Sequence, residues 1–426
     1  MAGGARLTAD TVVVGAGSAG LVIAQALSGD RDVVLLEGGP IAAPAAATRR
    51  LTALPLGGDR VRRYRESRES RGRDVVRGRG LGGSAVVNGG YFLRGHRSDY
   101  AAWPWPQEGI AAAFDRVDGG AAGGGFMRVS EFADAELGAV AKRFESYWRA
   151  EGLDSSSAAP WPGTGLNRVR SNRHDGGRWT AADALPPSAS GTTLLRATAT
   201  ALIEARGAIV GVHTTAGRID AAEIVLAAGT LGSGALLSPW TGPLGTFEHP
   251  ERIVRFTPRA PLRRVPLLQT VLHTADGLEL RCYGDDFASY IPGVGRRGVP
   301  IGIADMSSPT RGVLAPSGVL DLGEPDAESR ARMARGVDQV VAMLGSPAFA
   351  DVVAPGSIVV DPVVGVSSHA WGTLPLGERV DAGGRIDGVD GVRVVDGSVL
   401  PELLRSGPHA SILAAASLIA ETIRAE

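Results

Sequence analysis

The stretch TVVVGAGSAG, from Thr11 to Gly20, decides the fold of this chain. A short run of β-branched residues ends at Gly15, Gly17 and Gly20, which have the G-x-G-x-x-G spacing, and a helix-like run follows them. The first glycine permits a tight turn, the second lets the backbone approach a pyrophosphate, and the third lets helix and strand pack closely. The stretch therefore predicts a βαβ unit that binds a dinucleotide.

A second strand, DVVLLE (32–37), completes this unit and ends at Glu37. A carboxylate at that position hydrogen-bonds ribose hydroxyls and repels a 2′-phosphate. The helix that begins near Ser18 and Ala19 turns free N–H groups and the positive end of its dipole toward the phosphates. We therefore expect Ser18, Ala19 and Glu37 to contact the nucleotide together with the three glycines. On these residues alone, NAD and FAD both remain open.

The stretch RGRGLGGSAVVNGGYFLRG (77–95) favours FAD. Its small residues supply backbone amides and take up little volume, which suits a flat ring lying against the main chain. The predicted flavin contacts are Gly82, Gly83, Ser84, Asn88, Gly89 and Gly90.

The composition excludes several other classes of protein. Net charge is −1 over 426 residues, so nothing global favours nucleic acid or an anionic membrane as a partner. Cys282 is the only cysteine, which excludes an internal disulfide and a multi-cysteine metal site, and we predict no metal. We expect neither a signal peptide nor a transmembrane segment, and hence a cytoplasmic protein, with loose membrane association left open.

The middle of the chain predicts a second, antiparallel sheet. Residues 251–320 are rich in strands with turn breaks, and residues 328–344 have helical periodicity. Residues 104–160 show little pattern and include GGAAGGG (119–125), so we expect irregular structure there. Near the end, residues 411–423 predict a helix of small and apolar residues.

Two histidines stand near the C-terminus, one in SSHAWGT (367–373) and one in SGPHASIL (406–413). Taken alone, each is better explained as a hydrogen-bonded structural histidine than as a catalytic group. The neighbouring motifs change that balance.

Together these motifs resemble the glucose–methanol–choline (GMC) oxidoreductases, FAD enzymes that oxidise alcohols. The glycine loop with Glu37 resembles the family's ADP-binding start, and GRGLGGSAVVNGGYF (78–92) resembles its first signature. AAGTLGSGALL (227–237) resembles the second signature, and EHP (248–250) stands where the family usually has Asp-His-Pro. SHAWGT and GVRVVDGSVLP (391–401) resemble the C-terminal flavin and active-site segments.

The resemblance implies the fold and its division. We expect an α/β protein, with a Rossmann-like FAD-binding domain and an interleaved antiparallel-sheet substrate domain, the GMC fold. The FAD-binding domain would comprise residues 1–98, 186–250 and 352–426. The substrate domain would comprise residues 99–185 and 251–351.

The resemblance also implies roles for the two histidines. His369 has the H-x-x-G-T setting of the family histidine that lies over the flavin and serves the substrate hydroxyl, and His409 matches the second member of the pair. A neutral imidazole accepts the hydroxyl proton while hydride leaves for flavin N5, and its partner stabilises the developing alkoxide. Which histidine is the principal base stays open.

Four further residues match cofactor positions of the family. Asp396 and Gly397 match those that meet the ribityl and phosphate portion of the flavin. The helix that begins near Ala410 and Ser411 would turn its dipole toward the pyrimidine ring.

The chain also departs from the family pattern. Val87 stands where some members carry a histidine bonded covalently to flavin, so we expect non-covalent FAD, and Gly407 stands where the family often has Asn. The compact length, Arg-Arg-Tyr at 62–64, the NGGYF run and the Gly-Pro before His409 are similar to the mycofactocin-associated GMC dehydrogenases.

The narrower resemblance implies a peptide-derived alcohol, mycofactocinol, as substrate and a respiratory carrier as electron acceptor. The alternatives are an alcohol oxidase that reduces oxygen to hydrogen peroxide, acting on a small-molecule alcohol, and a flavin-fold protein that binds a partner without turnover. The sequence decides neither the exact alcohol, nor the electron acceptor, nor the oligomeric state.

Overall fold

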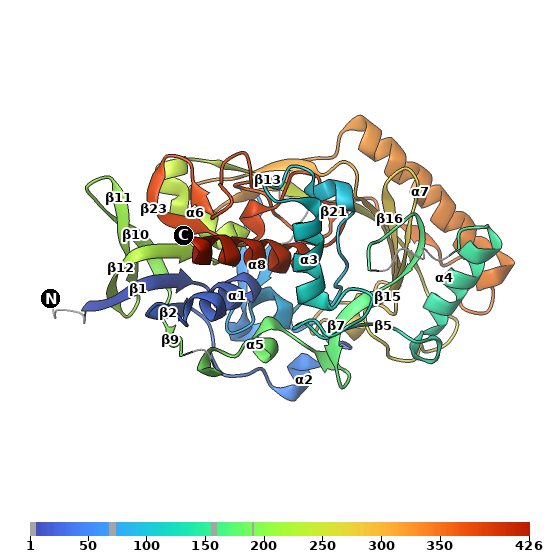
Figure 1. Cartoon of the computed structure of the whole chain (residues 1–426). Coiled ribbons are helices and arrows are strands. Elements are labelled where there is room, and N and C mark those ends of the chain that lie inside the picture. The colour runs from blue at the N-terminus through green and yellow to red at the C-terminus, as the bar shows by residue number, and fades with distance from the viewer. Residues whose placement is uncertain (1–5, 68–73, 155–159, 190) are drawn as a thin grey trace.

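The computed structural model describes residues 6–67, 74–154, 160–189 and 191–426, and it contains two large sheets that lie side by side (Figure 1). The sheet nearest the N-terminus is mostly parallel, whereas the other is antiparallel. Each has its own cluster of buried apolar side chains. The site described below lies where segments of the two sheets meet.

The first sheet has eight strands and is built on the TVVV run. In spatial order its main path is β10-β11-β23-β12-β1-β2-β9, and β22 pairs with β23. Strand β1 lies between β2 and β12, and all three run parallel. The bounds are β1 (Arg6–Val14), β2 (Val33–Glu37), β9 (Thr193–Arg196), β10 (Ala199–Ala205), β11 (Ala208–Thr214), β12 (Gly217–Leu226), β22 (Arg385–Ile386) and β23 (Val389–Val394).

Three helices pack side by side next to this sheet. Helix α1 (Ser18–Leu27) contacts α8 (His409–Ala425), and α8 contacts α3 (Gln107–Asp118), as Figure 1 shows. Small residues such as Ala414 and Ala415 on α8 allow the close approach. Helix α6 (Thr230–Thr241) follows β12, and the short α2 (Ala46–Arg49) and α5 (Ala181–Ala184) lie in connections.

The second sheet has seven strands, and its two faces carry different chemistry. Its main path is β20-β14-β17-β16-β15-β6, with β21 beside β14. Helices α4 (Ala139–Ala150) and α7 (Ala327–Gly345) pack on it. The strands are β6 (Gly165–Arg168), β14 (Pro250–Phe256), β15 (Leu268–His273), β16 (Leu278–Tyr283), β17 (Val299–Asp305), β20 (Val359–Val360) and β21 (Gly365–Val366).

Strand β16 shows how the faces differ. Successive side chains of a strand point to opposite faces. Leu278 and Leu280 approach Gly336 of α7, so Glu279 and Arg281 point to the other face. That other face is directed toward the histidines of the candidate site.

Smaller sheets connect these parts. Residues 61–64 and 75–78 form the hairpin β3 (Val61–Tyr64) and β4 (Val75–Gly78). The remaining strands are β5 (Val129–Glu131), β7 (Arg170–His174), β8 (Gly177–Arg178), β13 (Leu244–Glu248), β18 (Thr310–Leu314) and β19 (Leu320–Asp321).

The predicted fold class is confirmed, and one local expectation is wrong in part. The described part of residues 104–160 contains α3 and α4, although the glycine run 119–125 lies outside helices and strands as predicted. The proposed domain boundaries stay a prediction. The structure adds that α3, from the proposed substrate domain, packs on α8 of the proposed FAD-binding domain. Conversely, β20 and β21, from the proposed FAD-binding domain, pair with β14 of the second sheet.

Candidate functional site

The predicted glycine turn forms a close contact between β1, α1 and β12. Gly15 has a φ of +108°, a conformation that glycine adopts without strain, and its Cα hydrogen points at the carbonyl of Ala227. A Cβ on Gly20 would lie 1.9 Å from the carbonyl oxygen of Gly15. Any larger residue at position 20 would therefore push the helix away from the turn.

A second glycine segment lies directly against this turn. Gly83 opens the short 3-10 helix η3 (Gly83–Val86), and a Cβ on it would stand 2.9 Å from Cα of Gly17. The remaining predicted residues of this segment are engaged locally. Ser84 Oγ accepts the N–H of Gly78, and Asn88 Oδ1 accepts the N–H of Gly90. The structure therefore brings together the two glycine stretches that the sequence analysis singled out.

Glu37 lies at the end of β2, as predicted, and its carboxylate is already strongly engaged. Oε2 accepts the N–H of Ala16 at 3.0 Å, while Oε1 accepts those of Gly39 at 2.7 Å and Gly80 at 2.9 Å. A carboxylate has about four lone-pair sites. Glu37 thus ties three loops together and keeps about one acceptor position for a ribose hydroxyl, so its ribose contact stays a prediction.

Asp396 joins the C-terminal segment to α6. Its carboxylate accepts the hydroxyl of Ser233 at 2.5 Å and the N–H of Ser398 at 2.8 Å, and burial raises its pKa. A Cβ on the adjacent Gly397 would meet Thr230 Oγ1 at 2.5 Å. Of the predicted pair on α8, Ala410 is buried, and Ser411 shares a 2.7 Å hydrogen bond with the Tyr100 hydroxyl.

These residues fit FAD. The N-cap of α1 is Gly17, which gives no side-chain cap, so the first-turn N–H groups stay available for a pyrophosphate. Gly17 and Gly83 bring their backbones into contact with each other, and a Cβ on Gly89 would meet only the side chain of Leu267. The set that would hold FAD consists of the glycine turn, Glu37, the segment 82–90, Asp396 with Gly397, and the first turn of α8.

His369 is held by a second histidine, His249, which is the histidine of the EHP motif. Nδ1 of His369 lies 2.8 Å from Nδ1 of His249, and the rings meet edge to face. Nε2 of His249 lies 2.6 Å from the carbonyl oxygen of Leu404. His249 is completely buried and follows directly after β13.

The hydrogen-bond partners fix the proton positions along this chain. A carbonyl only accepts, so Nε2 of His249 carries the proton that it donates to Leu404. Burial, with the nearby Arg281 charge, lowers the pKa of His249 to about 3, so the ring is neutral and its Nδ1 accepts. His369 must then donate from Nδ1. Burial, His249 and Arg281 lower the pKa of His369 well below its ordinary value, so its Nε2 holds a lone pair.

Gly407 lies close to that nitrogen. A Cβ on Gly407 would lie 3.6 Å from Nε2 of His369 and 3.8 Å from Cδ1 of Tyr91. Glycine at position 407 therefore avoids a side-chain contact with Nε2 of His369. A hydroxyl that reaches Nε2 finds an acceptor that bears no proton.

His409 has a different environment. Its Nε2 shares a 2.9 Å hydrogen bond with Ser18 Oγ at the start of α1, and its ring packs edge-on against Phe92. Burial lowers its pKa to about 4, and its Nδ1 has no partner among the described residues. The structure brings His409 to the glycine turn and His369 to His249. The predicted catalytic role of His409 stays a prediction.

Beyond Tyr91 lies a buried charged network on the second sheet. Arg281 donates to Glu279 at 2.6 Å, to Glu251 at 2.9 Å and to Ser367 at 2.6 Å. Glu279 also accepts the Tyr91 hydroxyl at 2.7 Å. Although burial alone raises the pKa of Glu279, Arg281 and the bonds to its neighbours hold it well below its ordinary value. The network thus places buried charges beside Tyr91 and beside Ser367, two residues before His369.

Glu248, His249 and His369 offer ligand atoms within 4.8 Å of one another, as a metal site would. Their atoms are already committed to other partners. The two Nδ1 atoms bond each other, and the Glu248 carboxylate accepts backbone N–H groups. We therefore interpret the trio as a hydrogen-bonded cluster, in which the two imidazoles bond each other and Glu248 holds their backbone. The EHP motif was the sequence signal from which Glu248 and His249 could have been found.

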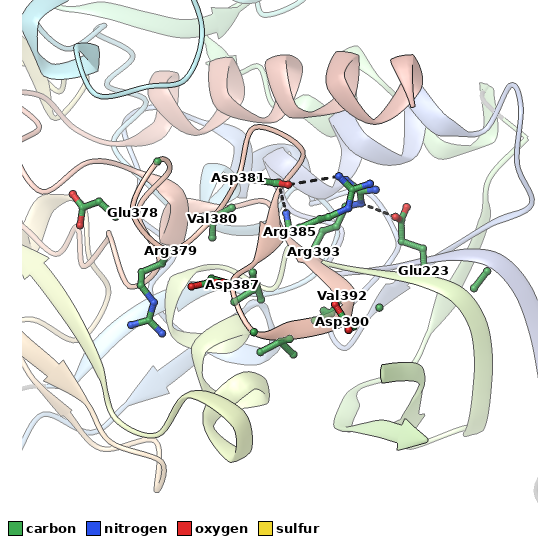
Figure 2. A pocket seen from close by; sticks show the side chains of 16 residues that line it. Glu223, Glu378, Arg379, Val380, Asp381, Arg385, Asp387, Asp390, Val392 and Arg393 are labelled. Atoms are coloured by element: carbon green, nitrogen blue, oxygen red, sulfur yellow. Dashed lines mark hydrogen bonds and ion pairs between the residues drawn. The ribbon is translucent and has the colours of Figure 1, made fainter. Parts of the chain in front are cut away.

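A separate hollow of about 550 Å³ lies beside β22 and β23, on the first sheet (Figure 2). Several of its charges are paired with one another: Arg393 bonds Glu223 at 2.6 Å, and Arg385 lies 3.6 Å from Asp381. We assign no ligand to this hollow.

A glycine turn of this kind and buried neutral imidazoles are parts that a dinucleotide-dependent oxidoreductase needs. The chain belongs to the GMC oxidoreductase family, whose N-terminal model matches residues 9–241 and whose C-terminal model matches residues 324–416. GMC oxidoreductases bind FAD and act on alcohol groups.

Two curated relatives illustrate the range of similarity. An uncharacterized GMC-type oxidoreductase from Rhodococcus erythropolis is 28% identical, and the alignment covers 95% of this chain and 96% of that protein. Pyridoxine 4-oxidase from Microbacterium luteolum is 30% identical over 54% of this chain and 51% of that protein.

Solved structures show the same fold. Pyridoxine 4-oxidase from Mesorbium loti superposes with a TM-score of 0.83 at 22% identity, covering 98% of this chain and 99% of that one. A formate oxidase gives a TM-score of 0.79 at 15% identity, with 99% and 98% covered. In the part of the chain that the structure describes, no helix has the length and apolar character needed to cross a bilayer.

Proposed function

We propose that this chain is an FAD-dependent alcohol dehydrogenase in which Nε2 of His369 is the base. The observation that carries the proposal is the relay from Leu404 through His249, which leaves Nε2 of His369 neutral and unprotonated. In the reaction the alcohol loses a hydroxyl proton and a carbon-bound hydride, and becomes a carbonyl compound. The proton passes to Nε2, and His369 keeps donating from Nδ1 to His249. Bound FAD supplies the hydride acceptor.

The alanine variant of His369 tests this assignment. His369→Ala should retain FAD, while reduction of the flavin by an oxidisable alcohol slows by about 10²–10⁴-fold, the usual contribution of a general base. His213→Ala is the matched control, because His213 lies exposed on β11. Anaerobic stopped-flow absorbance of the flavin measures both. Unchanged reduction in His369→Ala would refute the base.

We further propose a bulky, peptide-derived alcohol, with mycofactocinol as the specific substrate and a respiratory carrier as electron acceptor. The support comes from the sequence: its compact length, the Arg-Arg-Tyr at 62–64 and the NGGYF run. We propose non-covalent FAD because Val87 offers no attachment atom. Acid precipitation should then release the flavin into the supernatant.

An alcohol oxidase is the second candidate, because pyridoxine 4-oxidase and formate oxidase are among the similar proteins. Peroxide formed in step with alcohol consumption in air would establish the oxidase. Turnover that requires an added quinone or dye would establish the dehydrogenase. If mycofactocinol and a panel of small alcohols all leave the flavin oxidised, the remaining reading is a binding protein without turnover.

A further inference from the structure

The backbone around His369 is strained. Its two neighbours, Ser368 and Ala370, have φ values of +63° and +41°, in the left-handed region that residues other than glycine rarely adopt. Elsewhere in the described residues, Asp175 and Arg206 share this feature, and both lie in tight turns between adjacent strands. Such a conformation is unfavourable and persists only where its surroundings enforce it.

One carboxylate enforces it here. Glu248 is completely buried at the end of β13, and its Oε2 accepts the N–H of His369 at 2.8 Å and that of Ala370 at 3.1 Å. Oε1 accepts the N–H of His249 at 2.9 Å. Successive N–H groups in a turn form a nest that suits an anion, and bonds to a charged acceptor are stronger than neutral ones.

Arg77 holds the same residue from its other side. Its guanidinium donates to the carbonyl of His369 at 2.8 Å from the end of β4. Glu248 and Arg77 therefore fix both backbone polar groups of His369, and the same carboxylate also holds the backbone of His249. The two rings that share the 2.8 Å Nδ1 contact are thus anchored to a single acid.

We propose that Glu248 is a positioning residue, whose ionised carboxylate holds the strained 368–370 turn so that the His369 imidazole stays on His249 with Nε2 exposed to substrate. This inference rests on the proposed role of His369 as the base. It goes beyond that role by assigning the control of the imidazole's geometry to an acid that never touches substrate.

The proposal predicts a pH dependence. Burial raises the pKa of Glu248 to about 7, although the backbone N–H bonds and Arg77 act to lower it. The groups that face it are the Arg77 guanidinium and the imidazoles of His249 and His369, whose pKa values lie far lower. Arg281 and Glu279 act on those imidazoles from the second sheet. As pH falls through about 7, the carboxyl gains a proton and loses acceptor capacity, while the histidines stay neutral.

NMR of the histidine-labelled holoprotein tests the geometry without any substrate. The Nδ1 proton of His369, bonded to His249, should give a downfield resonance above pH 7 that broadens or shifts as pH falls to 6. Assignment uses its loss in His369→Gln. In Glu248→Gln the resonance should be altered at every pH and show no step near 7, whereas Glu248→Asp should keep a step. An unchanged resonance and step in Glu248→Gln would overturn the proposal.

A second variant keeps the test decisive if Glu248→Gln folds poorly. Arg77→Met removes the cation that favours the ionised acid, so the step should move to higher pH; a step that stays in place contradicts the proposal. The flavin-reduction assay of His369→Ala decides the proposed function separately. A slow His369→Ala enzyme with a Glu248→Gln enzyme that is normal in rate and spectrum would refute only the role of Glu248.

Discussion

The two sheets of this protein bury different chemistry. The first buries apolar runs such as 12–14 and 224–226, and it has close backbone contacts at the glycines where we predict the cofactor. The second places apolar side chains under α7 and buries Glu251, Glu279 and Arg281 on its other face. The first sheet is thus specified by close backbone approach at glycines, whereas the second is specified by paired charges on one face.

We expect the largest effect from removal of the Arg281 guanidinium, which lies between Glu251 and Glu279. Arg281→Met should destabilise the holoprotein by about 3–5 kcal/mol, because Glu251 and Glu279 would remain buried without their counter-charge. The deficit should narrow as pH is lowered toward 5, since uncompensated carboxyls then bind protons in the folded state. Denaturant unfolding followed by flavin and tryptophan fluorescence measures it.

The exposed pair of Arg335 and Asp276, at 3.3 Å, supplies the control. Arg335→Met should change stability by less than about 1 kcal/mol, as exposed ion pairs do. Equal effects of the two substitutions would mean that the charged face of the second sheet is not a buried network in solution.

A second test concerns the backbone contact between Gly83 and Gly17. Gly83→Ala adds a Cβ that would stand 2.9 Å from Cα of Gly17, and it must do so at a φ of +56°. We expect the dissociation constant of FAD to rise at least about 10-fold, because about 1.4 kcal/mol of loop displacement suffices for that change. Quenching of flavin fluorescence on titrating the apoprotein measures the constant.

Gly123→Ala is the matched control for backbone strain. Gly123 has a φ of +75°, but a Cβ there would meet nothing within 4 Å. Its FAD affinity should equal that of the unaltered chain. A similar loss in both variants would trace the effect of Gly83→Ala to general strain and not to contact with the glycine turn.

The smallest expected effect concerns His409, which lies on the cofactor side of the contrast. His409→Ala removes one hydrogen bond to Ser18, so FAD should bind about 10-fold more weakly at most, and flavin reduction should slow far less than in His369→Ala. Ser18→Ala should show the same loss, and the double variant should add little to it. Reduction as slow as in His369→Ala would instead establish the alkoxide-binding role that the sequence predicts.

How much the sequence could predict follows the same contrast. The glycine turn, Glu37 and the segment 82–90 were predictable because close backbone approach demands glycine at fixed spacings. The missed helix α3 carries a helical signal, with Ile110, Ala113, Phe114 and Val117 on one face, which the adjoining glycine run obscured.

The link between His249 and His369 was not predictable in this way. These residues are 120 positions apart, and a single hydrogen bond leaves no periodic trace. The charges of β14 and β16 likewise show only as strand residues until the sheet register places them together. The partners of buried polar side chains therefore had to come from the structure.

The first sheet pairs strands that are synthesised at very different times. Val12 pairs with Ile224, and Ile224 pairs with Val392, so the floor of the glycine turn is supplied by residues made much later than the turn itself. At roughly 5–20 residues per second, a ribosome needs on the order of 10–40 s between the first two of these strands. During that interval the glycine turn at residues 15–20 lacks its neighbouring strand β12. We therefore expect the predicted flavin site to be completed only after the strand around Val392 has left the exit tunnel.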